Sequence, residues 1–356
     1  MFLQHTNILQ CTTGCEAYAA ATYASTQAEL IAALSQYDDI CIRITADIDL
    51  SGAFTGGSQW NAGSYGTDAT QMHSGIGVFN GQKVRLYSDD NRVLSGQNAT
   101  RVVYAEANSE LTLDTLTLAD GTPGGGQSNG GAVYHLGSLD AIDVAFKNNA
   151  VATSSDEEAP NFSGGAIFAK GALTLDGCTF TSNTASKSGG CVAVLTTATV
   201  SDSTFVSCTA EKGGAIASVE HWDSGTVWGA ISSVAGSTFT SNSAGEGGAI
   251  FGLVSSITWS TFSANGNADD TNQGGAVYNK DAALSITNSV FDANIAGDNA
   301  GALYSDNAAV SLTGVTFTDN VNTAGEVVLT VASKAQNAPR AAQNGRCEPL
   351  KKRDSR

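Results

Sequence analysis

The sequence is poor in charge: only 14% of its 356 residues are Asp, Glu, Lys or Arg, which is low for a globular surface. Gly, Ser, Thr, Ala and Asn take the place of the missing charges. That mixture suits short turns and small stacked side chains, and it argues against a helical protein. Apolar residues still make up 42% of the chain, so it can bury a large core.

Basic residues are especially scarce outside the last 23 residues. Residues 334–356 hold seven of the 17 Lys and Arg and two of the 34 acids, so residues 1–333 carry 10 bases against 32 acids, a net charge of −22. A body this acidic repels nucleic acid and anionic membrane surfaces. We therefore expect no nucleic-acid partner.

Long apolar runs and common catalytic motifs are also missing. No run of about 18 apolar residues predicts a membrane-spanning helix. The sequence has no C-x-x-C pair, no H-E-x-x-H, no G-x-S-x-G and no Gly-rich phosphate loop, and its four His residues are scattered. We expect no catalytic residues, no metal ligands and no cofactor, with Ca²⁺ as the one ion that the acidic composition leaves open.

The seven cysteines are an odd number. Cys178 and Cys191 lie within the patterned part of the chain. We expect both to fill small interior slots as free thiols rather than to form a disulfide, because free Cys behaves as a small buried hydrophobe.

What the sequence does have is an internal repeat. A Gly-Gly pair begins each unit and a Phe-x-x-Asn motif follows, with successive Gly-Gly pairs 24 to 34 residues apart. At Phe205 the Asn is replaced by Cys208. The pairs start at Gly130, Gly164, Gly189, Gly213, Gly247 and Gly274, and the Phe residues that precede an Asn are Phe146, Phe180, Phe239, Phe262, Phe291 and Phe317.

The residues before each Phe predict strands. Small or apolar residues lie seven, five and two positions upstream, as Leu173, Leu175 and Cys178 do before Phe180. None of the short stretches within a repeat has the ten or more residues of 3.6 periodicity that a helix needs. Three short strands per repeat predict an all-β parallel β-helix solenoid of roughly 25 residues per coil, whose coils stack about 4.8 Å apart.

Stacked coils place like residues above like. The Phe residues should therefore form an interior aromatic stack. The Asn residues should occupy a repeated turn in the left-handed conformation and bond to the Asn above and below. Gly-Gly should let the chain turn into the first strand with φ > 0.

The two ends of the chain lack the repeat. We expect a poorly defined N-terminal segment over residues 1–25 and a β-helix domain over 26–333, with recognisable repeats over about 100–330. Residues 26–36 predict a short amphipathic helix that caps the open end of the solenoid, and residues 40–50 predict a first strand. Residues 334–356 predict a basic, disordered tail.

The repeat resembles one known family. Gly164–Ile167, Gly213–Ile216 and Gly247–Ile250 read GGAI, and the Phe motifs read FTSN, FSAN, FDAN and FTDN. Together they resemble the GGA[ILV]/FxxN repeat of the polymorphic outer-membrane-protein family. The resemblance implies a right-handed β-helix of the pectate-lyase-like superfamily and a secreted, surface-exposed role in adhesion. Because that superfamily also contains polysaccharide lyases and hydrolases, the resemblance implies carbohydrate-active enzymes as an alternative.

Insertions into the repeat are the candidate binding loops, because solenoid insertions become loops and loops carry function. The longest Gly-Gly-to-Phe span contains HWDSGTVW, and it supplies a candidate ligand-binding loop of His221, Trp222, Asp223 and Trp228. Aromatic rings beside Asp can stack on a sugar ring. The alternative is that the two Trp side chains pack locally on the solenoid wall.

Three hypotheses about function remain open. The first is a non-enzymatic extracellular or cell-surface protein that serves adhesion or structural display, with carbohydrate or another cell-surface molecule as its partner. The second is a polysaccharide lyase or glycoside hydrolase. The third is an inactive fragment of a larger surface protein. The sequence does not predict an oligomeric state, and its N-terminus lacks the basic and apolar regions of a convincing signal peptide.

Overall fold

The computed structural model describes most of the patterned part of the chain, and every structural statement below refers to these residues. They are 15–36, 38–51, 74–123, 129–152, 162–220, 227–267, 273–323 and 329–332. The basic segment 334–356 lies outside them.

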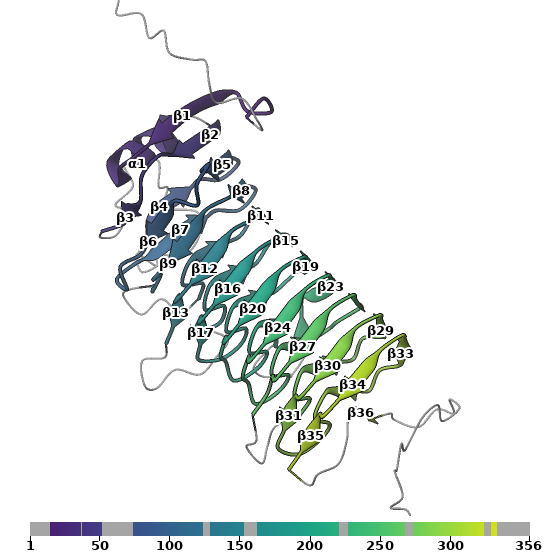
Figure 1. Cartoon of the computed structure of the whole chain (residues 1–356). Coiled ribbons are helices and arrows are strands. Elements are labelled where there is room, and N and C mark those ends of the chain that lie inside the picture. The colour runs from purple at the N-terminus through teal and green to yellow at the C-terminus, as the bar shows by residue number, and fades with distance from the viewer. Residues whose placement is uncertain are drawn as a thin grey trace, which may run out of the picture.

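Three long parallel sheets run the length of the molecule (Figure 1). The first sheet contains β1 (Ala20–Ala24), β2 (Asp39–Ile44), β5 (Lys83–Tyr87), β8 (Glu110–Asp114), β11 (Ser138–Ile142), β15 (Leu173–Asp176), β19 (Thr197–Ser201), β23 (Ala230–Ala235), β26 (Ser256–Thr258), β29 (Leu284–Thr287) and β33 (Val310–Thr313). The second contains β3 (Ile48–Asp49), β6 (Val93–Ser95), β9 (Thr117–Ala119), β12 (Ala145–Lys147), β16 (Thr179–Thr181), β20 (Thr204–Val206), β24 (Thr238–Thr240), β27 (Thr261–Ser263), β30 (Val290–Asp292) and β34 (Thr316–Thr318).

The third sheet contains β4 (Ser74–Val78), β7 (Arg101–Ala105), β10 (Val133–His135), β14 (Ile167–Ala169), β18 (Val192–Val194), β21 (Ile216–Glu220), β25 (Ile250–Gly252), β28 (Val277–Lys280), β32 (Leu303–Asp306) and β36 (Leu329–Ala332). Two short ladders join β13 (Ala150–Val151) to β17 (Thr184–Ala185) and β31 (Ile295–Ala296) to β35 (Val321–Asn322). The strand β22 (Val227–Trp228) pairs antiparallel with β21.

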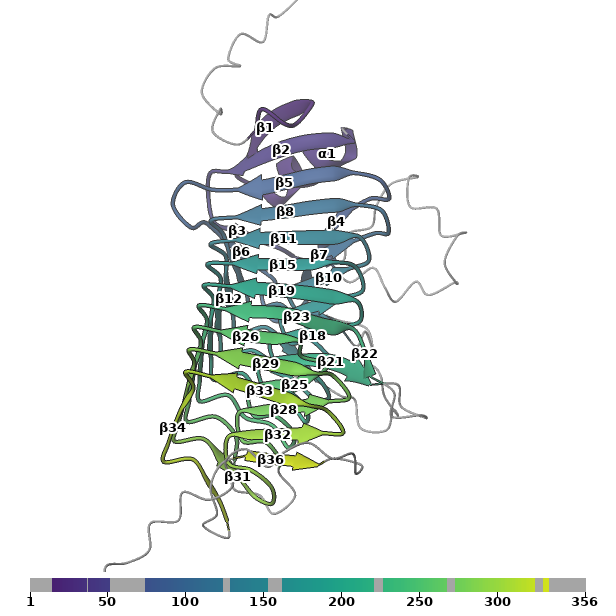
Figure 2. The ribbon, with the colours of Figure 1, turned by 90° about the vertical axis from the view of Figure 1, so that its right-hand side faces the viewer.

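Each coil contributes one strand to each long sheet, and the strands of one sheet lie in register above one another. Phe180, for example, pairs with Phe205, and Leu173 pairs with Ala198. Figure 2 shows the strands of the first sheet stacked in this way. The fold is the predicted right-handed parallel β-helix.

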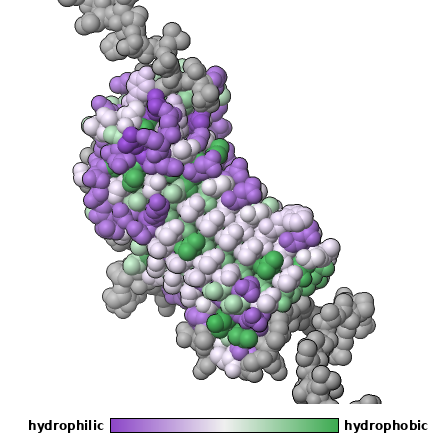
Figure 3. Space-filling model, viewed as in Figure 1, coloured by the Kyte–Doolittle hydropathy of each residue, from purple (hydrophilic) through white to green (hydrophobic). Residues whose placement is uncertain are grey.

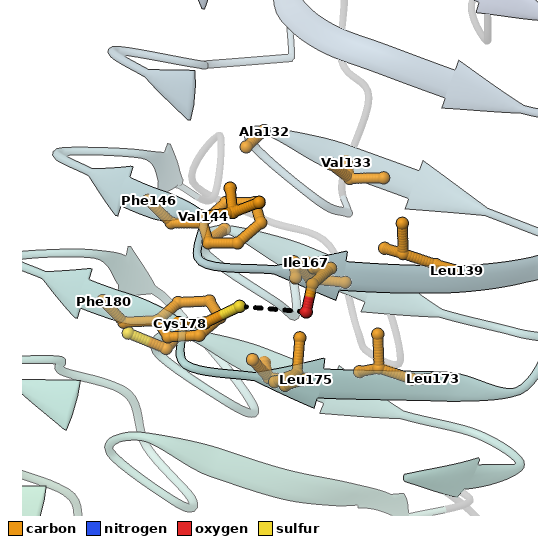
Figure 4. Close-up of a cluster of buried hydrophobic side chains, with 14 of the residues drawn as sticks. Ala132, Val133, Leu139, Val144, Phe146, Ile167, Leu173, Leu175, Cys178 and Phe180 are labelled. Atoms are coloured by element: carbon orange, nitrogen blue, oxygen red, sulfur yellow. Dashed lines mark hydrogen bonds between the residues drawn. The ribbon is translucent and has the colours of Figure 1, made fainter. Parts of the chain in front are cut away.

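The predicted aromatic stack runs through the core along the inner side of the second sheet. Seven Phe rings lie one above another with centroids 4.6 to 5.1 Å apart, in the order Phe146, Phe180, Phe205, Phe239, Phe262, Phe291 and Phe317. Figure 4 shows the first two rings beside the aliphatic columns of the first and third sheets, such as Leu139 above Leu173. The spacing between rings equals the strand spacing of a sheet, so each coil adds one ring without strain.

The Asn residues form the predicted ladder, but in a different backbone conformation. Asn242, Asn265 and Asn294 are fully buried, and each donates from Nδ2 to Oδ1 of the next and to the carbonyl of the Phe one coil earlier. The left-handed residue is the one before each Asn, for example Ser241 at φ 54° and Ala264 at φ 52°. The prediction of left-handed Asn was wrong: the preceding residue makes the turn, and the Asn that follows it directs its amide inward.

The two glycines of each Gly-Gly pair are required for different reasons. The first glycine has the predicted positive φ, as Gly189 does at 63°. The second is required by the stacking of coils, because a Cβ on Gly190 would overlap the carbonyl oxygen of Gly214 in the next coil. A side chain at that position would force adjacent coils apart.

The predicted capping helix is α1 (Gln27–Gln36), which buries Leu30 and Leu34 over the N-terminal end of the core. Its first turn is held by Thr26, whose Oγ1 accepts from the backbone N–H of Glu29, while the Glu29 carboxylate accepts from Ser25. The expected single strand over 40–50 was wrong. It is divided into β2 and β3, which belong to different sheets, and β1 precedes both within the segment expected to lack definition.

Two disulfides join Cys15 to Cys41 and Cys191 to Cys208. The prediction of a free thiol at Cys191 was therefore wrong. The prediction for Cys178 is confirmed, since its thiol is fully buried and donates to the carbonyl of Ala141 at 3.3 Å (Figure 4). Burial raises the pKa of the Cys178 thiol to about 12.

Candidate functional site

The outer face of the third sheet carries a column of aromatic side chains that is separate from the core. The column passes through one residue per strand, and we call it the outer aromatic row: Tyr104, Tyr134, Phe168, Ala193, Ala217, Phe251, Tyr278 and Tyr304. Successive side chains of a strand point to opposite faces of the sheet, so the residues before and after each member of the row point into the solenoid. The row therefore lies on the outside of the wall.

The outer aromatic row has two halves. In the first, the ring of Tyr134 stacks between those of Tyr104 and Phe168, with centroids 5.5 and 5.2 Å away. In the second, the ring of Tyr278 lies 5.2 Å from that of Phe251 and 4.9 Å from that of Tyr304. Ala193 and Ala217 separate the halves. Of the aromatic members, only Tyr134 and Tyr304 are half-exposed, and the others are buried.

Three basic side chains lie over these rings. The guanidinium of Arg101 lies 5.3 Å and the ammonium of Lys170 lies 5.6 Å from the centroid of Tyr134, and the ammonium of Lys212 lies 5.0 Å from that of Phe251. Each is close enough for a cation–π interaction. The first half of the row thus combines flat apolar rings with positive charge. At the second half the charge is balanced, because the Lys212 ammonium also lies 3.1 Å from the Glu246 carboxylate.

Arg101 is the most unusual of the three because it is 1% exposed. Its guanidinium donates to the carbonyls of Asn129 and Gly130 and to Oγ of Ser74. Burial lowers its pKa to about 10, so it stays charged at neutral pH. Its bonds tie the start of β4 to the turn that precedes β10, and they fix where the chain re-enters the third sheet after residues 52–73 and 124–128.

Only one residue of the predicted ligand-binding loop belongs to the described part of the chain. His221, Trp222 and Asp223 lie outside the described residues. Trp228 is placed by its backbone in β22, opposite Val219 of β21. The hairpin of β21 and β22 therefore begins on the strand that carries Ala217, where the aromatic rings are interrupted.

Four segments outside the described residues precede strands of the same sheet in the sequence. They are residues 52–73, 124–128, 153–161 and 268–272, and the next strands of the three long sheets after them are β4, β10, β14 and β28, all of the third-sheet wall. The aromatic row on that wall was missed in the sequence, although its signal is present: a Tyr or Phe lies four residues after the first Gly in several repeats.

The second sheet offers a contrasting, uniform surface. Its outward positions are filled mostly by Thr, as at Thr179, Thr204, Thr238 and Thr261, and Figure 3 shows pale, regular rows over this face. No insertion longer than a turn interrupts its strands in the described coils. The wall with the varied chemistry is the third sheet.

The described residues hold neither a cluster of metal ligands nor a membrane-spanning helix. Nowhere in the described part of the chain do three or more His, Cys, Asp or Glu side chains gather so that they could hold a metal ion. Among the same residues, no helix has both the length and the apolar character needed to span a bilayer.

These features define a class: a right-handed parallel β-helix repeat protein. The comparisons with known proteins agree. Residues 236–253 match the family model described as the Chlamydia polymorphic membrane protein repeat, and they include Phe239, Asn242 and the GGAI element that begins at Gly247. The chain thus carries the repeat of a family associated with the outer membrane or cell surface. No curated protein matches the chain.

Proposed function

We propose that this chain is a non-enzymatic protein of the extracellular space or cell surface, which holds binding loops on a rigid solenoid for adhesion or display. The observation that carries the proposal is the position of the β21–β22 hairpin, which begins at the break in the outer aromatic row. The matched repeat, of a family associated with the cell surface, supports the location.

The ligand class that fits this wall is carbohydrate. Aromatic rings stack on the apolar faces of sugars, and the half-exposed rings of Tyr134 and Tyr304 are the members of the row open to such a contact. Lys170 adds donors for hydroxyl or carboxylate oxygens beside the ring of Tyr134.

Binding to a glycan array and to intact cells tests the proposal. The variants Trp222→Ala and Trp228→Ala should each weaken binding at least tenfold. The matched control is Trp259→Ala, because Trp259 is 69% exposed and lies between β26 and β27, away from the third sheet. Equal binding by all four proteins would reject the hairpin as the binding element.

A second assay distinguishes the proposed binding protein from a polysaccharide lyase or glycoside hydrolase. The purified protein is incubated with polyuronates and Ca²⁺, and unsaturated or reducing products are measured. Turnover would replace display by catalysis as the function, whereas binding without products would favour adhesion.

A further inference from the structure

The turn between β4 and β5 holds an Asn-Gly pair, Asn80 and Gly81. The N–H of Gln82 donates to the carbonyl of Phe79 at 3.0 Å, and Gly81 has φ 79°, as the third residue of a type II turn requires. Both residues of the pair are exposed, and a Cβ on Gly81 would have no neighbouring atom within 4 Å. The pair can therefore change its conformation without displacing other groups.

An exposed Asn-Gly pair can react with itself. The main-chain nitrogen of the Gly attacks Cγ of the Asn and forms an N–Cγ bond, while the Cγ–Nδ2 bond breaks and ammonia leaves with the proton of the attacking nitrogen. The resulting succinimide ring takes up one water molecule and opens at either carbonyl carbon, which leaves aspartate or isoaspartate. Gly favours the attack because it has no side chain to obstruct ring closure.

The fold distinguishes this pair from others of the same sequence. Asn-Gly pairs begin at Asn80, Asn129, Asn265 and Asn344, of which Asn344 lies outside the described residues. At the second and third pairs the attacking nitrogen is already engaged: the N–H of Gly130 donates to the carbonyl of Ser163 at 3.1 Å, and that of Gly266 donates to the carbonyl of Asn242 at 2.8 Å. Their Asn side chains are 9% and 0% exposed. Among the described residues, no main-chain carbonyl accepts from the N–H of Gly81.

A neighbouring side chain polarises the amide of Asn80. Asn108 lies in the equivalent turn of the next coil, and its Nδ2 donates to Oδ1 of Asn80 at 3.1 Å. A donor at that oxygen stabilises the negative charge that develops there when the nitrogen attacks Cγ. The N–H of Asn80 donates to the Glu106 carboxylate at 2.9 Å, which holds the reacting residue in the turn.

We propose that Asn80 and Gly81 form a self-modification site, at which Asn80 converts to aspartate and isoaspartate while Asn129 and Asn265 stay intact. Water is the co-reactant and ammonia is the second product. The rate rises with pH, because the attacking nitrogen must give up its proton. The proposal does not depend on the ligand of the third sheet, and it is tested without one.

The modification acts on the helix that caps the solenoid. Gln82 is 4% exposed, its Nε2 donates to the carbonyl of Leu34 at 2.8 Å, and its Oε1 accepts from the N–H of Phe79 at 2.7 Å. A carbonyl in the last turn of a helix, as that of Leu34 in α1, needs such a partner from outside the helix. Isoaspartate at position 80 adds one carbon to the main chain between Phe79 and Gln82, so the turn no longer presents Gln82 to both partners. The attachment of α1 therefore weakens as the protein ages.

Peptide mapping by mass spectrometry tests the proposal on the full chain, held for days at mildly alkaline pH. Asn80, Asn129 and Asn265 fall in three different tryptic peptides, so each conversion is measured separately. We expect Asn80 to convert at least tenfold faster than either of the others in the folded protein, and all three to convert at similar rates in urea. Equal rates in the folded protein would overturn the proposal, and so would an intact Asn80 under conditions in which the chain in urea converts.

Two variants test the chemistry of the site. Asn80→Gln should block the conversion, because Gln has to close a larger ring. Asn108→Ala should slow it about threefold, since the polarising donor is lost. The matched control is Asn307→Ala, because Asn307 is an exposed Asn in the corresponding turn between β32 and β33, where it bonds to Asp281. Equal rates in the variants of Asn108 and Asn307 would contradict the role of Asn108.

Hydrogen exchange tests the effect on the cap. The isoaspartate form is separated by ion-exchange chromatography, and its α1 amides should exchange at least tenfold faster than those of the unconverted protein. Asn80→Asp carries the added charge without the added carbon and should exchange like the parent. Equal exchange in all three proteins would show that the modification leaves the cap in place and would overturn this part of the proposal.

Discussion

The side-chain amide of Asn265 donates to Oδ1 of Asn294 at 2.9 Å, although 29 residues separate them in the sequence. The same Asn265 accepts, through Oδ1, from both the backbone N–H and Nδ2 of Asn242. One side chain thus joins three coils. Because all three Asn are buried, each amide is satisfied only if its neighbours are in register.

This arrangement predicts a large effect of Asn265→Ala. The change removes two donated bonds and leaves two buried donors of Asn242 without an acceptor, so the free energy of unfolding should fall by roughly 2–5 kcal/mol. Chemical denaturation measures it. Asn299→Ala is the control, since its exposed amide bonds only to Asp298, and a change equal to that of Asn265→Ala would contradict the role of the ladder.

The aromatic stack predicts that Phe239→Ala will lower the free energy of unfolding by roughly 3–5 kcal/mol, because it removes a fully buried ring between Phe205 and Phe262. Thermal melting measures the loss. Trp259→Ala, which truncates a ring that is 69% exposed, should stay within about 0.5 kcal/mol of the parent. Near-parental melting of Phe239→Ala would mean that the ring adds little to the core.

The Cys191–Cys208 disulfide replaces one unit of the Asn ladder. Cys191 lies in the column of Ala166 and Ala215, and the backbone N–H of Cys208 donates to Oδ1 of Asn242 at 3.0 Å, as an Asn at this position would. Reduction should therefore cost about 3 kcal/mol, the value expected for a loop of this length. The measurement is unfolding with and without reductant.

The double variant Cys191→Ala/Cys208→Asn provides the sharper test of the same site. It gives this coil the residues of its neighbours, so the introduced amide should link Asn183 to Asn242. We expect it to be more stable than Cys191→Ala/Cys208→Ala by about 1–3 kcal/mol. Equal stability of the two double variants would show that the ladder tolerates a gap here.

Burial lowers the pKa of His135 from 6.5 to about 4, opposed by its contact with the Gly137 carbonyl. The unfolded chain then takes up a proton near pH 6.5 while the folded chain does not, so stability is lost as the pH falls from about 6.5 to about 4. The loss should reach about 3 kcal/mol, at 1.36 kcal/mol per unit.

His135→Asn should remove this part of the pH dependence while keeping the fold, because the same inward column already holds a buried Asn at Asn279. Denaturation curves of the parent and the variant are compared between pH 4 and pH 7. Parallel curves over this window would mean that the pKa of His135 is the same in the folded and the unfolded chain.

The sequence predicted the core residues better than the residues on the outer face of the third sheet. The Phe column and the first Gly of each pair were predictable because one residue type recurs at a fixed spacing. The outer aromatic row was missed because its column mixes Tyr, Phe and Ala, so that no single residue type repeats. The row can be recognised as a surface feature only when it is known which face of each strand points outward.

Two further features could be recognised only in the three-dimensional structure. The pairing of Cys191 with Cys208 was not predicted because the residues belong to two different columns, which meet only where the coil closes. The strand β1 was missed because residues 20–24 carry no repeat, and its place is set by pairing with β2. The roles of Trp222 and Trp228 remain predictions.

The Cys191–Cys208 bridge has a mechanical consequence. A chain pulled from its two ends would peel away coil by coil, since each coil is held only by its neighbours. The bridge joins residues 17 positions apart and so turns one coil into a covalent ring in the middle of the array. Under tension the force passes through the disulfide, so the residues between Cys191 and Cys208 cannot be extended. The fully unfolded oxidised chain would therefore be shorter than the reduced one.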